Sequence, residues 1–356
     1  MKKPVKIILI IFFALVLLAI GGSWVLSVYI YNENFNQRFE SYEPQMLRVE
    51  DFDGLERTKY EFPSDKGQML TGYLYSHGEA DPQGIIILAH GFGGGGHNSY
   101  MDVADYFARN GFLVFAYDAT GNDESEGKGV GGLPQGVIDL DHAINFVETS
   151  GDFPNLPIML FGHSWGAYSA GSVLSYHPEV SAVIACSGFN SSPDMFEAEG
   201  RREAGEGIAL FMPFVKLHES IRYGKYASSS VLSGLAASEA RVMIVHGTED
   251  DFVPASIGYD RYHEKFADDP RFSFVMLDGQ GHNYVYDDMT YINDFNAAFD
   301  KWLMALDYDY KAKENKDRFA ADKAEYIHQN LDREQWSHKL NKELFENFIS
   351  FFRDSI

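Results

Sequence analysis

Residues 157–166 of this 356-residue chain read PIMLFGHSWG, and the other predicted elements can be placed around them. An apolar run long enough for one buried strand ends in the pattern Gly-x-Ser-x-Gly, and residues 167–174 can continue as a helix. The pattern predicts a strand, a sharp turn and a helix, with Ser164 at the apex of the turn. Glycines flank the serine because a strained turn brings the backbone close to its neighbours, where a Cβ atom would clash.

The elements around this turn predict an α/β fold with a mostly parallel, doubly wound sheet. Continuous apolar runs are typical of strands that are covered on both faces, and their alternation with helical stretches is typical of doubly wound sheets. Two earlier segments are expected to form an antiparallel hairpin ahead of that sheet. The hairpin strands are expected at 57–62 and 68–76, and the others at 84–89, 112–117, 180–186, 241–245 and 272–277.

Composition and periodicity divide the chain into four parts. We expect a transmembrane signal-anchor at 1–31, a spacer at 32–56, the α/β domain at 57–306 and a helical extension at 307–356. Periodicity weakens at about 187–240, where prolines, glycines and serines are frequent, and a helical cap inserted over the site is expected there. Apolar residues in the extension recur at helical spacing, which predicts a helix that packs back onto the domain.

The N-terminus predicts export. Lys2, Lys3 and Lys6 precede an uncharged run over residues 7–31, which exceeds the roughly 20 residues that cross a bilayer as a helix. The lysines should stay in the cytoplasm, which would place the catalytic domain outside the cell membrane on a single-pass anchor. Residues 19–21 resemble a signal-peptide cleavage site, so secretion after cleavage is the alternative. The anchor is favoured because the apolar run continues well beyond that site.

The overall composition argues against nucleic acid as a partner and against disulfides, metals and organic cofactors. A formal net charge of −23 argues against nucleic acid, because a polyanion would be repelled. The single cysteine, Cys186, excludes an internal disulfide framework and lies in an apolar run as a core residue would. Metal ligands at paired spacings are not found, and we expect neither a metal nor an organic cofactor.

Two polar residues beyond later strands could activate Ser164. A serine hydroxyl is a poor nucleophile at neutral pH and needs a base, which a third group must orient. Asp250 and His282 each follow a predicted strand, and such positions gather along one edge of a parallel sheet. Glu249 and Asp251 compete with Asp250 for the orienting role, and spacing favours Asp250. The backbone N–H groups of Trp165 and Phe92 are the expected donors for an oxyanion. His90, His163 and His246 are expected to support loops by hydrogen bonding.

Four motifs together resemble the α/β-hydrolase superfamily, and within it the bacterial serine esterases and the acylaminoacyl- and prolyl-peptidase-like hydrolases. These motifs are HGFG at 90–93, GHSWG at 162–166, HGTED at 246–250 followed by Val253-Pro254, and Gly281-His282. The resemblance covers about residues 58–306. It implies the order nucleophile, acid, base that Ser164, Asp250 and His282 follow, with Phe92 and Trp165 as oxyanion donors.

The sequence departs from this family in one loop. Many relatives have arginine where Thr120 stands and glycine where Asp123 stands. The difference bears on the conformation of the loop and on substrate preference rather than on the triad.

The residues and the resemblance together favour a membrane-tethered serine hydrolase that cleaves a small or medium acyl ester through an acyl-enzyme. A peptidase for short or N-acylated peptides is the alternative of the same class, and a non-catalytic scaffold is the alternative of another class. Residues 91–96 also match the dinucleotide-binding pattern Gly-x-Gly-x-x-Gly after a strand. We reject that reading because the next helix is expected to begin only after residue 97 and because the serine, aspartate and histidine motifs would be left unexplained.

Overall fold

Eight strands form a single sheet in the computed structural model, which describes residues 3–78 and 81–356. Lys2 therefore lies outside the described residues. The strand order is β1-β2-β4-β3-β5-β6-β7-β8, and all neighbours from β4 to β8 are parallel. β1 pairs with β2, and β2 with β4, in antiparallel fashion. The prediction of a mostly parallel sheet behind an antiparallel hairpin is confirmed. The strands are β1 Glu56–Pro63, β2 Met69–Ser76, β3 Ile85–Ala89, β4 Leu113–Tyr117, β5 Ile158–His163, β6 Ala182–Cys186, β7 Arg241–Gly247 and β8 Phe272–Leu277.

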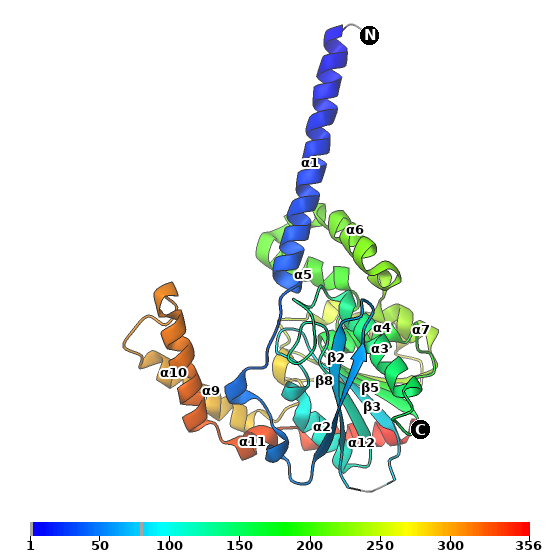
Figure 1. The fold of residues 1–356 in the computed structure, drawn as a ribbon, viewed down its shortest axis with the longest axis vertical. Coiled ribbons are helices and arrows are strands. Elements are labelled where there is room, and N and C mark those ends of the chain that lie inside the picture. Colours follow the sequence, from blue (N-terminus) through cyan, green and yellow to red (C-terminus); the bar gives the residue numbers. More distant parts are fainter. Residues whose placement is uncertain (1–2, 79–80) are drawn as a thin grey trace.

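Helices cover both faces of this sheet and bury a separate hydrophobic cluster on each (Figure 1). One face is covered by α3 (Pro134–Thr149), α4 (Trp165–Val173) and α8 (Tyr259–Phe266). The other face is covered by α2 (Met101–Arg109) and α12 (Lys342–Arg353). β3, β5 and β6 are buried along their whole length, as continuous apolar strands between two helical layers must be.

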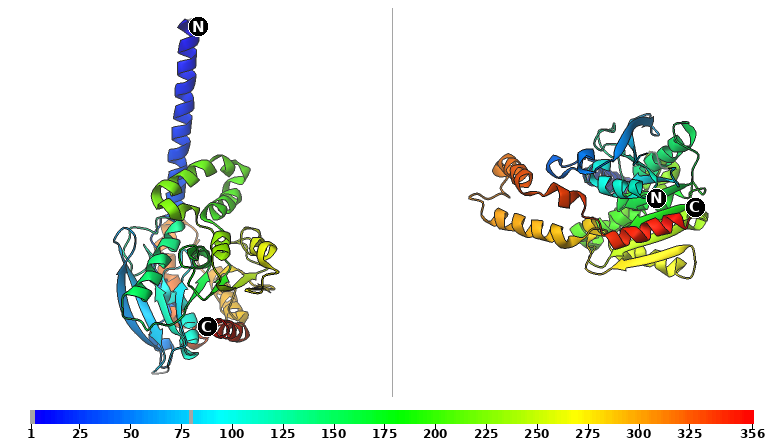
Figure 2. Two further views of the ribbon diagram at one scale, coloured as in Figure 1. Left: turned by 90° about the vertical axis from the view of Figure 1, so that its right-hand side faces the viewer. Right: turned by 90° about the horizontal axis from the view of Figure 1, so that it is seen from below.

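The helix α12 completes the helical layer on the second face of the sheet, although it lies beyond residue 306, where the α/β domain was expected to end. Its apolar stripe, from Leu344 to Phe352, is buried against the sheet and α2. Before it, α9 (Met289–Met304) and α10 (Lys316–Asn330) form a projecting arm, and α11 (Arg333–Ser337) leads the chain back (Figures 1 and 2). The hydrophobic core therefore needs the C-terminal segment, because α9 leaves the sheet after its first turns.

The region expected as a cap contains three helices, α5 (Ser192–Ala204), α6 (Met212–Tyr223) and α7 (Val231–Ala237). α5 and α6 surround the base of α1, whereas α7 packs directly on α4 (Figure 1). The contact between α7 and α4 is so close that a Cβ atom on Gly234 would lie 2.0 Å from the carbonyl oxygen of Gly171. The region between β6 and β7 thus combines a raised pair of helices with one helix that belongs to the core.

The helix α1 (Lys3–Phe35) is one continuous helix of 33 residues that stands out from the body (Figure 1). Its window of highest hydropathy averages 2.8, and none of that window is buried. From Ser27 onward the helix enters the body, where Tyr31 and Phe35 are buried against Phe196 of α5. The apolar N-terminal helix is present as predicted, and it continues four residues beyond the expected end at 31.

Residues 36–56, which we call the connecting segment, fall within the spacer expected at 32–56 and lie against the domain. The Phe39 ring packs against Phe92 with ring centroids 4.9 Å apart. The Phe39 N–H donates to the carbonyl of Gly121 at 3.0 Å, and Leu47 and Phe52 are buried in the second core. The sequence did not reveal this packing, because these aromatic and aliphatic side chains are spaced irregularly and form no periodic pattern.

A buried carboxyl group joins α1 to the region expected as a cap. The Tyr31 hydroxyl donates to Oε1 of Glu219 at 2.7 Å, and the Ser192 hydroxyl donates to the same oxygen. The other oxygen of Glu219 is buried and has no partner among the described residues. Burial raises the pKa of Glu219 to about 7, although its two hydrogen bonds act in the opposite direction.

Glu219 should therefore make the stability of the protein depend on pH. Its folded pKa lies above the ordinary value of 4.5, so the folded state holds the proton more tightly. The stabilisation is complete below pH 4.5 and is lost as the pH rises through about 7. Wild-type protein should lose on the order of 3 kcal/mol of unfolding free energy relative to Glu219→Gln between pH 5 and 8, as measured by urea unfolding. The exposed Glu206→Gln serves as control, and parallel pH profiles for wild type and Glu219→Gln would contradict the assignment.

Candidate active site

Ser164 lies in the sharp turn between β5 and α4, and its backbone is in the left-handed region with φ 56° and ψ −115°. Non-glycine residues seldom adopt this conformation, and surrounding contacts must enforce it. A Cβ atom on Gly162 would lie 2.3 Å from the carbonyl oxygen of Gly166, and one on Gly166 would lie 1.9 Å from that of Ala89. Both glycines are therefore required by close backbone approach, as the sequence predicted.

Replacing Gly166 with alanine should destabilise the fold strongly. The added methyl group would overlap a backbone carbonyl of the buried strand β3, which cannot move without disturbing the sheet. We expect a loss of about 4 kcal/mol or more, at the upper end for single substitutions. The matched control is Gly94→Ala, since nothing lies within 4 Å of a Cβ atom there. Equal urea midpoints for the two variants would contradict this account of the turn.

The structure brings the three expected side chains together. Nε2 of His282 lies 2.9 Å from Oγ of Ser164, and its Nδ1 lies 2.8 Å from Oδ2 of Asp250. Asp250 follows β7, and His282 opens a short 3₁₀ turn after β8, so both reach the carboxyl edge of the sheet. The competing carboxylates of Glu249 and Asp251 are exposed to solvent. Of the three carboxylates, Asp250 is the one that is buried and lies within hydrogen-bond distance of His282.

Asp250 is held in its ionised form. Burial alone would raise the pKa of its carboxyl, but the hydrogen bond and charge of His282 and the N–H of Val253 outweigh burial and lower the pKa. Oδ1 accepts from the N–H groups of Phe252 and Val253 at 3.1 and 2.8 Å. An anchored carboxylate of this kind would fix the ring of His282 with the proton on Nδ1, and Nε2 would then accept a hydrogen bond from the Ser164 hydroxyl.

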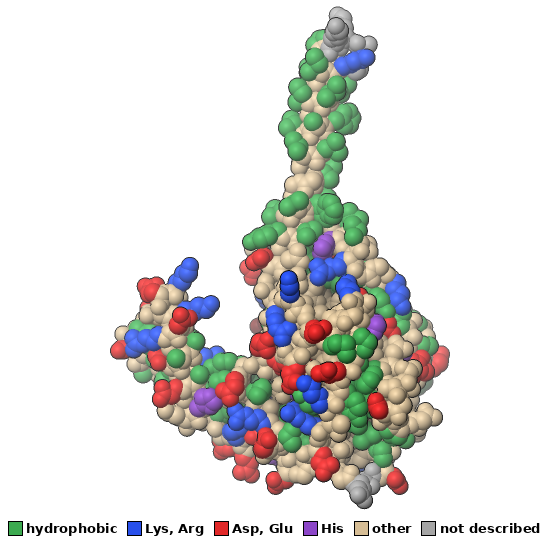
Figure 3. Space-filling view, viewed as in Figure 1, with side chains coloured by type: hydrophobic (Ala, Val, Ile, Leu, Met, Phe, Trp, Pro, Cys, Tyr) green, Lys and Arg blue, Asp and Glu red, His purple; other side chains and the backbone are tan. Residues whose placement is uncertain are grey.

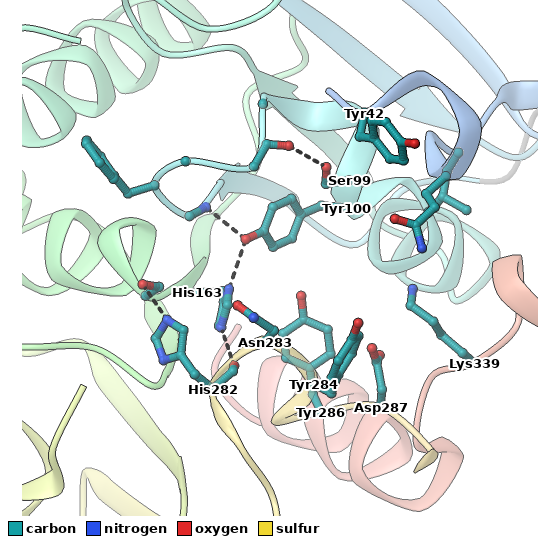
Figure 4. Close-up of a pocket in the computed structure, with 18 of the residues that line it drawn as sticks. Tyr42, Ser99, Tyr100, His163, His282, Asn283, Tyr284, Tyr286, Asp287 and Lys339 are labelled. Atoms are coloured by element: carbon teal, nitrogen blue, oxygen red, sulfur yellow. Dashed lines mark hydrogen bonds between the residues drawn. The ribbon is translucent and has the colours of Figure 1, made fainter. Parts of the chain in front are cut away.

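A second histidine connects the loops on either side of the site. The Gly91 N–H donates to the Tyr100 hydroxyl at 2.8 Å, and that hydroxyl lies 2.9 Å from Nδ1 of His163. Nε2 of His163 lies 2.9 Å from the carbonyl oxygen of His282 (Figure 4). Because burial lowers the pKa of His163 to about 3, its ring is neutral, accepts from Tyr100 and donates to His282. His163 has the supporting role expected from the sequence.

The other two supporting histidines also bond to loops. Nε2 of His90 accepts from the Ala119 N–H at 2.9 Å, and its Nδ1 lies 2.7 Å from the Gly91 carbonyl. Nε2 of His246 lies 3.0 Å from the carbonyl of Val253. These bonds hold the strand-end loops from which the candidate catalytic groups project.

The two expected oxyanion donors lie on adjoining backbone. Phe92 follows β3 in the glycine-rich loop, and its ring meets that of Trp165 edge to face at 5.6 Å. Within residues 3–78 and 81–356, neither the Phe92 nor the Trp165 N–H donates a hydrogen bond. Both N–H groups therefore lack a hydrogen-bond acceptor in the described part of the chain.

Asp123 explains the departure from the family pattern. Its φ of 33° lies in the left-handed region, which favours glycine. Its carboxylate accepts hydrogen bonds from the N–H and hydroxyl of Ser41 and from the Gly96 N–H. The side chain thus fastens the glycine-rich loop to the connecting segment, which a glycine could not do.

The glycine-rich loop is not built for a dinucleotide. The helix after it begins only at Met101, behind a 3₁₀ turn at His97–Tyr100. Asp118, which would have to bind a ribose, is fully buried and accepts from both the backbone and the ring of His97. The loop lines a cavity beside Ser164 instead.

That cavity has a volume of about 550 Å³ and includes Ser164 and His282 (Figure 4). Part of its wall comes from the connecting segment and from the C-terminal segment, neither of which was expected to reach the site. The contributing residues of these two segments are Tyr42, Gln45, Met46, Leu47, Trp336 and Lys339. Sequence reasoning missed them because nothing in their local pattern marks a pocket.

The chain is similar to known lipases and esterases. Residues 80–231 match the sequence profile of the family described as serine aminopeptidase, S33. A monoacylglycerol lipase of Mycolicibacterium smegmatis is 27% identical over 214 residues, which are 50% of this chain and 74% of that protein. A monoglyceride lipase of Rattus norvegicus is 36% identical over 88 residues, which are 24% of this chain and 28% of the lipase. An esterase of Pyrococcus furiosus shares the fold with a TM-score of 0.52 at 16% identity, covering 76% of this chain and 98% of its own.

Proposed function

Because this chain belongs to the α/β-hydrolase superfamily and is esterase- or lipase-like, we propose that it hydrolyses a carboxylic ester through Ser164, His282 and Asp250. The observation that carries the proposal is the continuous chain of hydrogen bonds from the Ser164 hydroxyl through both nitrogens of His282 to Asp250. Such an arrangement activates a serine hydroxyl, and the adjoining free N–H groups of Phe92 and Trp165 suit a developing oxyanion.

The reaction would run in two halves. Oγ of Ser164 attacks the acyl carbon while Nε2 of His282 takes its proton, and the N–H groups of Phe92 and Trp165 bind the oxyanion of the tetrahedral intermediate. His282 then gives the proton to the leaving alcohol, which leaves an acyl-enzyme. A water molecule that His282 deprotonates attacks this ester, and the proton returns to Ser164 as the acid departs. Asp250 stabilises the imidazolium in both halves.

The expected substrate is an ester of small or medium size, and monoacylglycerols are candidates because two relatives are named for them. Cleavage of short or N-acylated peptides is the second candidate, since the matching family profile is described as an aminopeptidase. Both activities use the same acyl-enzyme chemistry.

We also propose that α1 anchors the protein in the membrane. Besides its own apolar surface, α1 is surrounded at its base by exposed apolar side chains of the region expected as a cap, namely Leu210, Leu217 and Ile221 (Figure 3). Exposed apolar groups around such a helix suit the interface of a bilayer. Lys6 at the far end suits the cytoplasmic side.

The test uses full-length protein in detergent. A fluorophosphonate probe should label the protein at Ser164, as located by peptide mass spectrometry, and p-nitrophenyl esters from acetate to palmitate should be hydrolysed. Peptide p-nitroanilides compare the second candidate directly. Protein that neither reacts with the probe nor cleaves any of these substrates would be a scaffold, and the proposed function would be wrong.

A further inference from the structure

The cavity beside Ser164 extends to a charged cluster that the proposed reaction does not use. Figure 4 shows His282 at one end of the lining and Lys339 and Asp287 at the other. Lys339 lies between α11 and α12, and its ammonium group donates to the carboxylate of Asp102 on α2. We call Asp102, Asp287 and Lys339 the distal cluster.

The distal cluster contains a buried hydrogen-bonding atom without a partner. Asp287 is only 2% exposed, and its Oδ1 has no hydrogen bond among the described residues. A buried polar atom of this kind costs free energy until a partner binds it. Burial raises the pKa of Asp287, although the charge of Lys339 acts to lower it. The side chain can thus accept from a hydroxyl group or, when protonated, donate to one.

The charges of the distal cluster argue against a charged ligand. Lys339 already forms an ion pair with Asp102, and the charge of Asp287 also stabilises its ammonium group. An incoming carboxylate or phosphate would meet two acidic groups, and an ammonium group would meet the lysine. A neutral group that exchanges hydrogen bonds satisfies the cluster best.

The remaining walls combine hydrogen-bonding groups with aromatic faces. Tyr42 and Tyr284 supply hydroxyls, Gln45 supplies an amide, and Trp336 and Tyr286 supply rings. The Gln45 side chain has no hydrogen-bond partner within residues 3–78 and 81–356, which leaves its amide free. Rings of this kind pack against the C–H faces of a ligand while amides and carboxylates bind its hydroxyls. A long alkyl chain would leave these polar groups unpaired.

Given the proposed hydrolase function, we propose that the distal end of the cavity binds a neutral, sugar-like group with several hydroxyls, so that the substrate is an ester of a carbohydrate. The cavity of about 550 Å³ lies within the usual range for small-molecule sites. The ester bond would lie at Ser164, and the sugar ring would extend toward Asp287 and Trp336.

The test compares butanoyl esters that differ only in the alcohol. The ratio kcat/KM should be at least tenfold higher for 6-O-butanoylglucose than for butyl butanoate, with 1-butanoylglycerol between them. Asp287→Asn, and separately Gln45→Leu, should reduce this preference about tenfold through KM, and each should change hydrolysis of p-nitrophenyl butanoate less than hydrolysis of the sugar ester. Gln45→Leu breaks no side-chain hydrogen bond of the described protein, and the matched control Asp288→Asn changes an exposed cap of α9.

A binding measurement separates this inference from the proposed function. Methyl glucoside or cellobiose should change the tryptophan fluorescence of Ser164→Ala protein saturably, and Gln45→Leu should weaken that binding, whether or not any ester is cleaved. The inference is overturned if glucose and butyl esters react equally, if the variants affect p-nitrophenyl butanoate as much as the sugar ester, or if neither sugar binds. The distal cluster would then only fasten the C-terminal segment to α2.

Discussion

Replacing Ser164 with alanine is expected to reduce kcat for ester hydrolysis by about 10⁴- to 10⁶-fold, since the nucleophile of a serine hydrolase acts as a unit with its base. The residual rate should exceed that of the uncatalysed reaction, because the N–H groups of Phe92 and Trp165 still stabilise an oxyanion when water attacks directly. Initial rates with p-nitrophenyl butanoate and loss of fluorophosphonate labelling measure the effect.

The matched control for this substitution is Ser172→Ala. Ser172 lies two turns further along, at the end of the same helix, is fully buried, and its hydroxyl has no hydrogen-bond partner in the described chain. Its loss should change activity less than twofold. Similar rates for Ser164→Ala and wild type would show that the measured hydrolysis arises elsewhere, and the proposed mechanism would be abandoned.

Replacing Asp250 with asparagine should lower kcat by about 10⁴-fold while the protein remains folded. An asparagine amide can present its N–H₂ to Nδ1 of His282, which favours the tautomer with the proton on Nε2. That tautomer cannot accept the proton of Ser164, and the imidazolium formed in the reaction loses its neighbouring charge. KM should change little, because Asp250 lies behind the histidine and away from the cavity lining.

The neighbours of Asp250 provide controls at the same loop. Glu249→Gln and Asp251→Asn remove equivalent charges from exposed positions and should leave kcat within twofold of wild type. If Asp250→Asn retained more than a tenth of the activity, another group would orient His282. His246 lies 3.7 Å from Asp250, so a His246→Gln variant would be examined next.

The sheet and the candidate triad could be predicted because short-range patterns encode them. Continuous apolar runs locate β3 and β5. Gly162 and Gly166 indicate a turn in which a side chain at either position would clash with the backbone. Asp250 and His282 lie within five residues of the ends of β7 and β8, so the topology of a parallel sheet was enough to place them near Ser164.

The rest of the site could not be predicted because it depends on where distant segments dock. Gln45 and Lys339 lie almost 300 residues apart and share no pattern with the elbow, yet both line the cavity. The burial of Tyr31 could not be distinguished from membrane insertion, since both demand the same apolar helix. Asp123 was recognised as unusual, but only its bonds to Ser41 and Gly96 reveal what the substitution contributes.

The unbroken passage of α1 into the body has a geometric consequence for an anchored enzyme. Residues 4–26 stand clear of the body and would measure about 35 Å as a helix, slightly more than the roughly 30 Å hydrocarbon thickness of a bilayer. From Ser27 the same helix packs against α5 and α6, so no break in the helix separates the proposed anchor from the domain that carries the candidate active site. An anchored protein would then hold the cavity at a fixed distance and orientation relative to the bilayer surface. This arrangement would favour esters located at that distance from the lipid.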